Sequence, residues 1–340
     1  MAASFTDFWQ PILRTRKFVV LDGALATELE RRGADLADPL WSAKLLLENP
    51  DLIRQVHLDY LRAGANVITT ASYQASFAGF ARRGLSQDQA AELMLLSVRL
   101  AREARDRVLH ERRTGFLARP SAALGDSYSD SIRLDGLGSP SHDILIAASI
   151  GCYGAVLHDG SEYRGAYGLS RKDLMDWHRP RLALLAKSGA DLLACETIPC
   201  RVEAEALLEL LAEFPDVPAW LSFSCVDEAH VCHGETLAEC VALTRGHANI
   251  VAVGINCTPP HLVESLLRSV VGGTDCPLLV YPNSGERWNA ENGKWECCET
   301  SKVEWGRMAE MWFRAGARLI GGCCRTTPDD IEDLARLVSE

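Results

Sequence analysis

The chain has 340 residues, of which 47% are hydrophobic and 24% charged, a composition typical of a globular protein with a large core. Its formal net charge of −11, with no basic block, argues against nucleic acid or an anionic membrane surface as a partner. The first residues form no secretory signal, and no apolar run approaches the ~20 residues of a membrane span, so we expect a cytoplasmic protein.

Eight short apolar runs rich in β-branched residues recur along the chain, separated by amphipathic stretches. Their continuous apolarity, rather than alternation, is typical of parallel strands that are covered on both faces. The predicted strands are 18–23, 66–71, 144–151, 191–197, 219–225, 250–257, 277–283 and 317–324.

Helix signals lie between these runs. Asn49-Pro50 and Thr327-Pro328 each predict a helix start, because an N-cap residue precedes a proline of the first turn. The similar segments RAGANVITT, KSGADLLAC and RAGARLIGG predict helices that end at a glycine in a left-handed turn, at Gly64, Gly189 and Gly316.

This alternation predicts an α/β protein, a single (β/α)8 TIM barrel. We expect one domain over residues 1–340, with the barrel at about 18–338. An open doubly wound sheet is the alternative, although no GxGxxG motif follows the first strand to support a dinucleotide-binding version.

Two connections are long enough to suggest binding loops or decoration, namely 118–143 and 284–302. The second follows the carboxyl end of a strand, so we expect it to rise over the active face. The first precedes a strand, so we expect it at the opposite face. The vicinal pair Cys297-Cys298 in the second loop is interpreted as incidental.

Polar residues or glycine end nearly every apolar run, at the positions where a barrel of this kind builds its active site. A barrel with a purely structural role would not need so many reactive groups at one mouth. These positions are Asp22-Gly23, Thr69-Thr70, Gly151, Glu196-Thr197, Ser224-Cys225, Asn256-Cys257, Asn283 and Cys323-Cys324.

Three of these strand-end residues suggest a metal site. Cys257 ends the sixth predicted strand, and Cys323 and Cys324 end the eighth, after Gly321-Gly322. Zinc binds thiolates well, and a catalytic zinc site has three protein ligands and one open position. Adjacent strand residues point to opposite faces, so both vicinal thiols reach one metal only if the chain bends at the two glycines. The alternatives are small buried residues or a vicinal disulfide.

Six motifs resemble those of the homocysteine S-methyltransferases, over residues 18–335. GINCTPP (254–260) and GGCCRTTP (321–328) resemble the two zinc motifs of that family. The others are DGALATELERRG (22–33), NVITTASYQAS (66–76), ETIP (196–199) and YPNSGE (281–286). The likeness is greatest to the plant and bacterial enzymes that use S-methylmethionine.

The resemblance implies a zinc-dependent TIM-barrel enzyme that moves a methyl group from a sulfonium donor to homocysteine, forming methionine. Cys257, Cys323 and Cys324 would be the catalytic Zn²⁺ ligands. The expected substrate-binding residues are Asp22 with Gly23 and Glu196 for the ammonium, Thr70, Ser72 and Tyr73 near the donor, and Asn256 and Asn283 as orienting groups.

The motifs are compatible with more than one methyl donor and more than one class of function. S-methylmethionine is the expected donor and S-adenosylmethionine is an alternative, whereas Gln74, which stands where betaine-using relatives have tyrosine, argues against betaine. Paired carboxylates also suggest a glycosidase, which the adjacent thiols disfavour. A non-catalytic barrel that stores zinc or senses oxidation is a different class of function. We expect a monomer, because the extra segments of dimeric relatives are not recognisable.

Overall fold

The computed structural model describes residues 7–38, 40–114, 143–285, 287–289, 294–296 and 304–338. The predicted loop 118–143 therefore lies outside the described residues, apart from its last residue. Much of the loop 284–302, including Cys297-Cys298, lies outside them as well.

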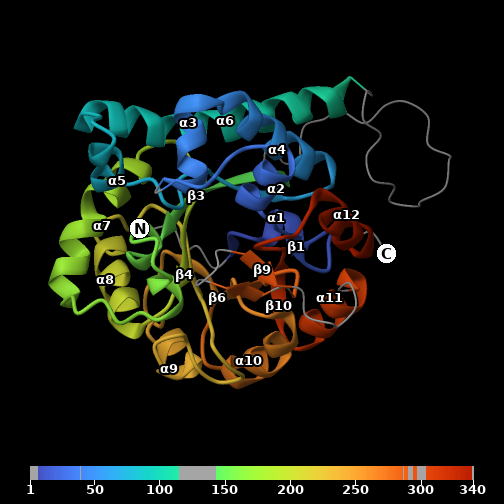
Figure 1. Ribbon diagram of the computed structural model, residues 1–340. Helices are drawn as coiled ribbons and strands as arrows, with labels where there is room; N and C mark the ends of the chain where they lie inside the picture. Colours follow the sequence, from blue (N-terminus) through green and yellow to red (C-terminus); the bar gives the residue numbers. More distant parts are fainter. Residues whose placement is uncertain are drawn as a thin grey trace.

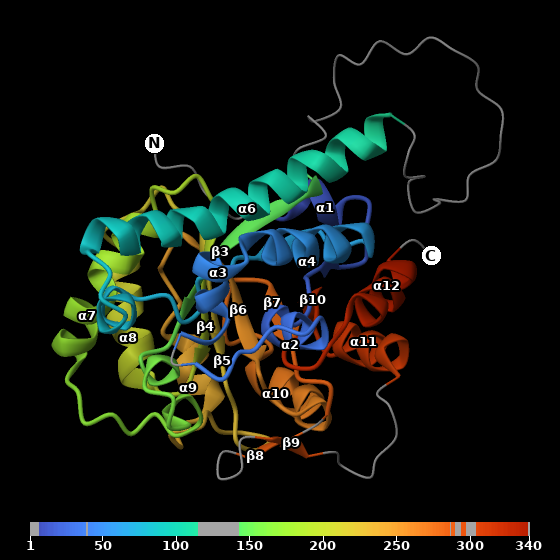
Figure 2. The same ribbon diagram turned by 45° about the horizontal axis from the view of Figure 1, so that its top comes forward.

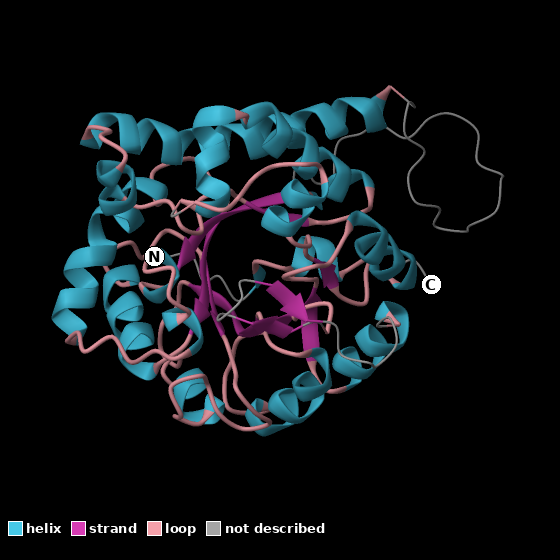
Figure 3. Ribbon diagram, viewed as in Figure 1, coloured by secondary structure: helices cyan, strands magenta, loops and turns pink. Residues whose placement is uncertain are grey.

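Eight parallel strands form a nearly closed barrel surrounded by helices (Figures 1 and 3). The order around the sheet is β1-β10-β7-β6-β5-β4-β3-β2. A parallel bridge between Leu21 and Val67 brings the two ends together, with the Asn66 amide donating to the Val20 carbonyl at 2.7 Å. The (β/α)8 barrel is confirmed, and the open doubly wound sheet is wrong.

All eight predicted strands are present, most of them shorter than expected. They are β1 Val19–Val20, β2 Val67–Thr69, β3 Leu145–Gly151, β4 Leu192–Ile198, β5 Ala219–Phe223, β6 Ile250–Asn256, β7 Leu278–Tyr281 and β10 Ala317–Ile320. Regular pairing stops early at several carboxyl ends because the chain turns there to form the site.

An antiparallel hairpin that the sequence did not predict lies in the connection after β7. It pairs β8 (Arg287–Asn289) with β9 (Lys294–Glu296). Figures 1 and 2 place this hairpin over the carboxyl end of the barrel, the face on which the sequence placed this loop.

The helices cover the outside of the barrel. The two predicted helix starts are confirmed, whereas the helices before Gly64, Gly189 and Gly316 end two to four residues ahead of these glycines. Asn49 caps α4 through its side-chain oxygen, and the Thr327 amide donates to Asp330 at the start of α12. Gly64, Gly189 and Gly316 have φ of 106°, 82° and 113°. The helices are α1 Gln10–Leu13, α2 Leu25–Arg31, α3 Leu45–Glu48, α4 Pro50–Arg62, α5 Phe77–Arg82, α6 Gln87–Arg113, α7 Arg171–Leu185, α8 Arg201–Leu211, α9 Leu237–Ala242, α10 Val263–Val270, α11 Trp305–Arg314 and α12 Pro328–Leu337.

Buried apolar side chains form two layers. The larger layer packs the sheet against the helices, and the smaller one fills the inside of the barrel. Trp9 and Ile12 belong to the inner layer, and the Trp9 indole donates to the Val251 carbonyl at 2.7 Å. They therefore close the amino-terminal end of the barrel and leave the carboxyl end for the site. Among the described residues, no helix combines the length and the apolarity that a membrane span requires.

Candidate metal and substrate site

The carboxyl ends of the strands surround a cavity of about 700 Å³. Most of the sequence-predicted site residues line it, namely Asp22, Gly23, Thr70, Tyr73, Glu196, Asn256, Cys257, Cys323 and Cys324. Ser72 and Asn283 are buried beside the site and are not among the lining residues.

The three predicted cysteines meet at one point of this cavity. The Cys257 Sγ lies 2.9 Å from the Cys323 Sγ and 3.7 Å from the Cys324 Sγ. All three sulfur atoms lie within 4.8 Å of one another. Three thiols so close together, partly or wholly buried and facing a cavity, could hold a metal ion and leave room for a further ligand.

The local backbone explains how adjacent cysteines reach the same point. Cys257 has a φ of 49°, so the chain leaves β6 in a left-handed turn. Past β10, the Gly321 amide donates to the Val280 carbonyl at 3.0 Å and the Cys323 amide to the Pro282 carbonyl at 2.7 Å, so the chain stays beside β7 as far as the first cysteine of the pair. A Cβ on Gly322 would lie 2.4 Å from the Thr326 Oγ1. The glycine is thus required by close packing, whereas the sequence suggested conformational freedom.

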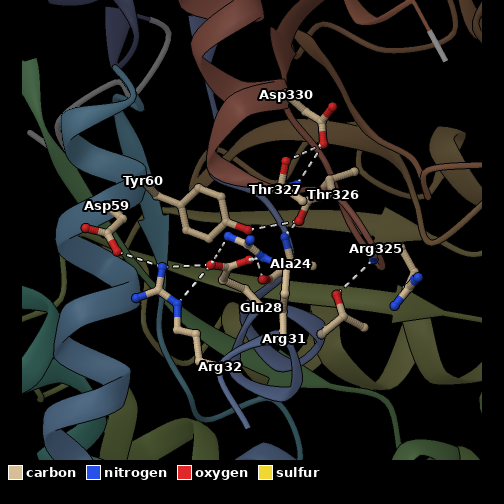
Figure 4. A network of polar contacts seen from close by, with 11 residues as sticks. Ala24, Glu28, Arg31, Arg32, Asp59, Tyr60, Arg325, Thr326, Thr327 and Asp330 are labelled. Carbon is tan, nitrogen blue, oxygen red and sulfur yellow. Dashed lines mark hydrogen bonds and ion pairs between the residues drawn. The ribbon is translucent and has the colours of Figure 1, made fainter. Parts of the chain in front are cut away.

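A network of hydrogen bonds joins the turn that contains the cysteine pair, residues 323–327, to the loop after β1; Figure 4 shows the part of it around Thr326. The Thr326 hydroxyl donates to the Cys323 carbonyl at 2.6 Å and accepts from the Ala24 amide at 3.1 Å. The Tyr60 hydroxyl, from α4, lies 2.9 Å from the Ala24 carbonyl and 3.0 Å from the Thr326 carbonyl. The Cys323 turn and the loop that follows Asp22 are therefore held by the same contacts.

We expect Thr326→Val to weaken metal binding by about 10–100-fold, the usual cost of losing a group that orients metal ligands. Valine keeps the shape of threonine but leaves the Cys323 carbonyl and the Ala24 amide without this partner. Competition with a chelator measures the affinity, and Thr326→Ser, which keeps the hydroxyl, is the control. Equal affinities of the valine variant and the wild type would show that the contact does not position the ligands.

Two buried carboxylates face the cavity beside the thiols. Asp22 accepts hydrogen bonds from the Thr69 amide at 2.7 Å and the Thr69 hydroxyl at 2.8 Å. Glu196 accepts from the Ser149 hydroxyl and from the Tyr281 hydroxyl at 3.1 Å. Burial raises the pKa of Asp22 to about 7 and that of Glu196 to about 8. No described basic side chain forms an ion pair with either, so both are free to receive a cationic ligand.

The remaining predicted residues have structural contacts. Asn256 binds both the amide and the hydroxyl of Thr197, at 2.8 and 2.7 Å, and so joins the ends of β6 and β4. The Ser72 hydroxyl lies 2.7 Å from that of Thr70 and donates to the Ser149 carbonyl at 2.8 Å. The Asn283 amide donates to the Thr258 carbonyl at 3.1 Å. Ser72 therefore lies behind the cavity wall and contacts Thr70, which lines the cavity.

Tyr73 is held in the wall by a buried arginine. The Arg181 guanidinium, from α7, donates to the Tyr73 carbonyl at 3.2 Å and to the Gly151 carbonyl at 2.6 Å. The Tyr73 ring meets Trp41 edge to face at a centroid distance of 6.3 Å. Tyr73 and Trp41 therefore present two aromatic rings to the cavity.

Sequence reasoning missed a part of the wall supplied by the connection after β3. The Tyr163 hydroxyl lies 3.8 Å from the Cys257 Sγ, and Glu162 lines the cavity next to it. Burial raises the pKa of Glu162 to about 7. The usable signal was position alone, because this segment follows the carboxyl end of a strand as the predicted residues do.

Comparisons with known proteins agree with this geometry. The model of the homocysteine S-methyltransferase family matches residues 19–338. The homocysteine S-methyltransferase YbgG of Bacillus subtilis is 48% identical over 331 residues, 96% of each chain. Homocysteine S-methyltransferase 3 of Zea mays is 47% identical and covers 95% of this chain and 90% of its own. The metallated form of the homocysteine methyltransferase MmuM from Escherichia coli superposes with a TM-score of 0.80 at 44% identity, covering 96% of this chain and 99% of its own. The chain therefore belongs to the homocysteine S-methyltransferase family.

Proposed function

We propose that the protein transfers a methyl group from S-methylmethionine to the thiol of L-homocysteine, forming methionine, with Zn²⁺ held by Cys257, Cys323 and Cys324. The observation that carries the proposal is the meeting of three thiols with two unpaired carboxylates in one cavity. An amino acid with a thiol side chain fits both groups, because its sulfur can bind a metal held by the three thiols and its ammonium can pair with the carboxylates. Membership of the homocysteine S-methyltransferase family supports the same acceptor.

The donor set fits zinc better than a hard cation, because all three ligand atoms are sulfur. When bound, the ion would lower the pKa of a substrate thiol, so that the thiol is present as the nucleophilic thiolate. The protein needs no general base beside the sulfur, since the proton leaves on binding.

The carboxylates of Asp22 and Glu196 orient the acceptor. Both are fixed by hydrogen bonds to Thr69, Ser149 and Tyr281, so an ammonium placed against them has a defined position. Holding the acceptor sulfur and the donor methyl in line supplies much of the rate enhancement. The thiolate forms the new carbon–sulfur bond while the donor's methyl–sulfur bond breaks, and the electron pair of that bond stays on the donor sulfur as a thioether.

The cavity also suits a cationic donor. No lysine or arginine is among its described lining residues, and Tyr73 and Trp41 present aromatic rings. S-adenosylmethionine shares the sulfonium charge and is the second donor to test. The family argues against the non-catalytic zinc-storing or redox-sensing barrel, since its members are methyltransferases.

Turnover with each donor in parallel tests the proposal. The zinc-loaded protein should form methionine from homocysteine with S-methylmethionine, more slowly with S-adenosylmethionine, and not with betaine. Removal of the metal by a chelator should stop the reaction, and added Zn²⁺ should restore it. If no sulfonium donor yields methionine, the proposed function is wrong. The monomeric state and cytoplasmic location expected from the sequence belong to the same proposal, and light scattering of the purified protein tests the first.

A further inference from the structure

The short turn η5 (Ser161–Tyr163) brings a glutamate to the cavity in a fixed position. The Ser161 amide donates to Asp159 at 2.9 Å, and the Ser224 hydroxyl donates to the Glu162 carbonyl at 3.2 Å. Gly154 packs so closely beneath the turn that a Cβ there would lie 2.5 Å from the Glu162 amide nitrogen. The backbone of Glu162 is therefore held from several sides.

The same turn lies beside the metal ligands, because Tyr163, the next residue, reaches the Cys257 Sγ with its hydroxyl at 3.8 Å. A ligand that presents an atom to a thiol at the metal therefore passes close to Glu162. In a methyl transfer, that atom is the donor's methyl carbon, and the positive sulfur is bonded directly to it.

Among the described residues, six carboxylates line the cavity, and five of them have an evident partner or face solvent. Asp38 pairs with Arg83, and Asp159 with Arg164 at 3.5 Å. Glu30 is exposed. Asp22 and Glu196 receive the hydrogen bonds described above. The sixth is Glu162, which makes no ion pair with a described residue.

One oxygen of Glu162, Oε2, is buried and has no hydrogen-bond partner among the described residues. A buried carboxylate oxygen without a donor or a cation costs free energy, and native proteins retain such groups where a ligand completes them. Gln74 repeats the pattern in the same cavity, since it is 5% exposed and its Oε1 also has no partner in the described part of the chain. Both groups are acceptors, so they suit a ligand that presents hydrogen-bond donors or positive charge, and the carboxylate of Glu162 favours positive charge.

We infer that Glu162 is the specificity-determining carboxylate that faces the sulfonium of the methyl donor. The inference rests on the proposed function for the identity of the ligand. The donor's charge disappears during transfer, since a thiolate and a sulfonium become two neutral thioethers. Glu162 therefore stabilises the bound donor more than the transition state, which lowers KM without raising kcat.

Glu162→Gln tests this with little change of shape. We expect the KM for S-methylmethionine to rise about tenfold or more, with kcat within about threefold and the zinc content and homocysteine affinity unchanged. Glu162→Asp keeps the charge and should recover part of the affinity. Glu213→Gln is the matched control, because it removes the charge of an exposed glutamate that pairs with Arg179 away from the cavity, and its KM should stay within about twofold.

Equilibrium titration separates this inference from the proposed function. The zinc-loaded wild type should bind S-methylmethionine more tightly than methionine, its neutral counterpart, and Glu162→Gln should lose that preference. A preference retained by Glu162→Gln, or absent from the wild type, would overturn the inference even if the enzyme turns over. A Glu162-dependent preference in a protein that forms no methionine would support the inference and refute the proposed function.

Discussion

Replacing Cys257 with serine should remove the bound metal and the methyl-transfer activity together, while the barrel stays folded. Cys257 is the ligand that the other two thiols approach, at 2.9 and 3.7 Å. A serine hydroxyl is a poor ligand for a soft site of this kind. Changes that only disturb the orientation of metal ligands cost about 10–100-fold, so the loss of a ligand itself should cost more than that.

The fold should survive because the barrel does not depend on these thiols. Cys257, the residue that is replaced, contributes no side chain to the inner or the outer layer of apolar side chains. Metal content per chain, methionine formation and circular dichroism are the three measurements. An unfolded variant, or one that keeps a full complement of metal, would contradict the prediction.

Cys276→Ser is the matched control for this experiment. Cys276 precedes β7, at the opposite end of that strand from the site, and its thiol donates to the Ile250 carbonyl at 3.1 Å. Serine can make the same hydrogen bond, so this variant should keep its metal and its activity. A loss of metal from both variants would mean that any change of thiol content, rather than loss of a ligand, removes it.

The fold was predictable because each level of the sequence points to the same answer. Apolar runs of strand length alternate with capped helices, and Gly64, Gly189 and Gly316 occupy backbone conformations that side chains rarely adopt. The strand ends were less predictable. The regular strands β1 and β10 end at Val20 and Ile320, and beyond them only isolated bridges and single backbone hydrogen bonds continue, which periodicity does not encode.

The chemistry of the site was also readable, because thiols and carboxylates at strand ends have few structural reasons to be there. The contacts that hold them were not. Tyr60 and Thr326 are separated by 266 residues, and Arg325 and Thr27 by 298. Tyr163 and Glu162 had no motif of their own to mark them. Contacts between residues so far apart in the sequence form only when the barrel closes, so no local sequence pattern predicts them.

Glu196→Gln should raise the KM for homocysteine by about 100-fold while the metal stays bound. Removing one partner of a buried, hydrogen-bonded charge pair costs about 2–5 kcal/mol, and the ammonium of homocysteine would lose that partner. Glu205→Gln, on the outer surface of α8, is the control and should leave the KM unchanged. Steady-state kinetics at saturating donor measure both, and an unchanged KM in Glu196→Gln would exclude the carboxylate from acceptor binding.

Glu196→Gln should weaken homocysteine binding but stabilise the metal-free protein against unfolding at high pH. Burial raises the pKa of Glu196 from 4.5 to about 8, so between these values the folded state keeps a proton that the unfolded chain loses. The free energy of unfolding therefore falls as the pH rises through this window and levels off above about pH 8. Glutamine has no proton to lose, so its decline should be shallower, and above pH 8 the variant should be more stable by a few kcal/mol. Asp22, whose pKa is also raised, titrates in both proteins. Denaturant unfolding from pH 5 to 9 therefore gives, as the difference between the slopes, the contribution of Glu196 together with its repulsion of Asp22. Parallel slopes would show that burial does not raise the pKa of the Glu196 carboxyl. A steeper wild-type decline would mean that the free protein tolerates a destabilising charge which the ammonium of the substrate then neutralises.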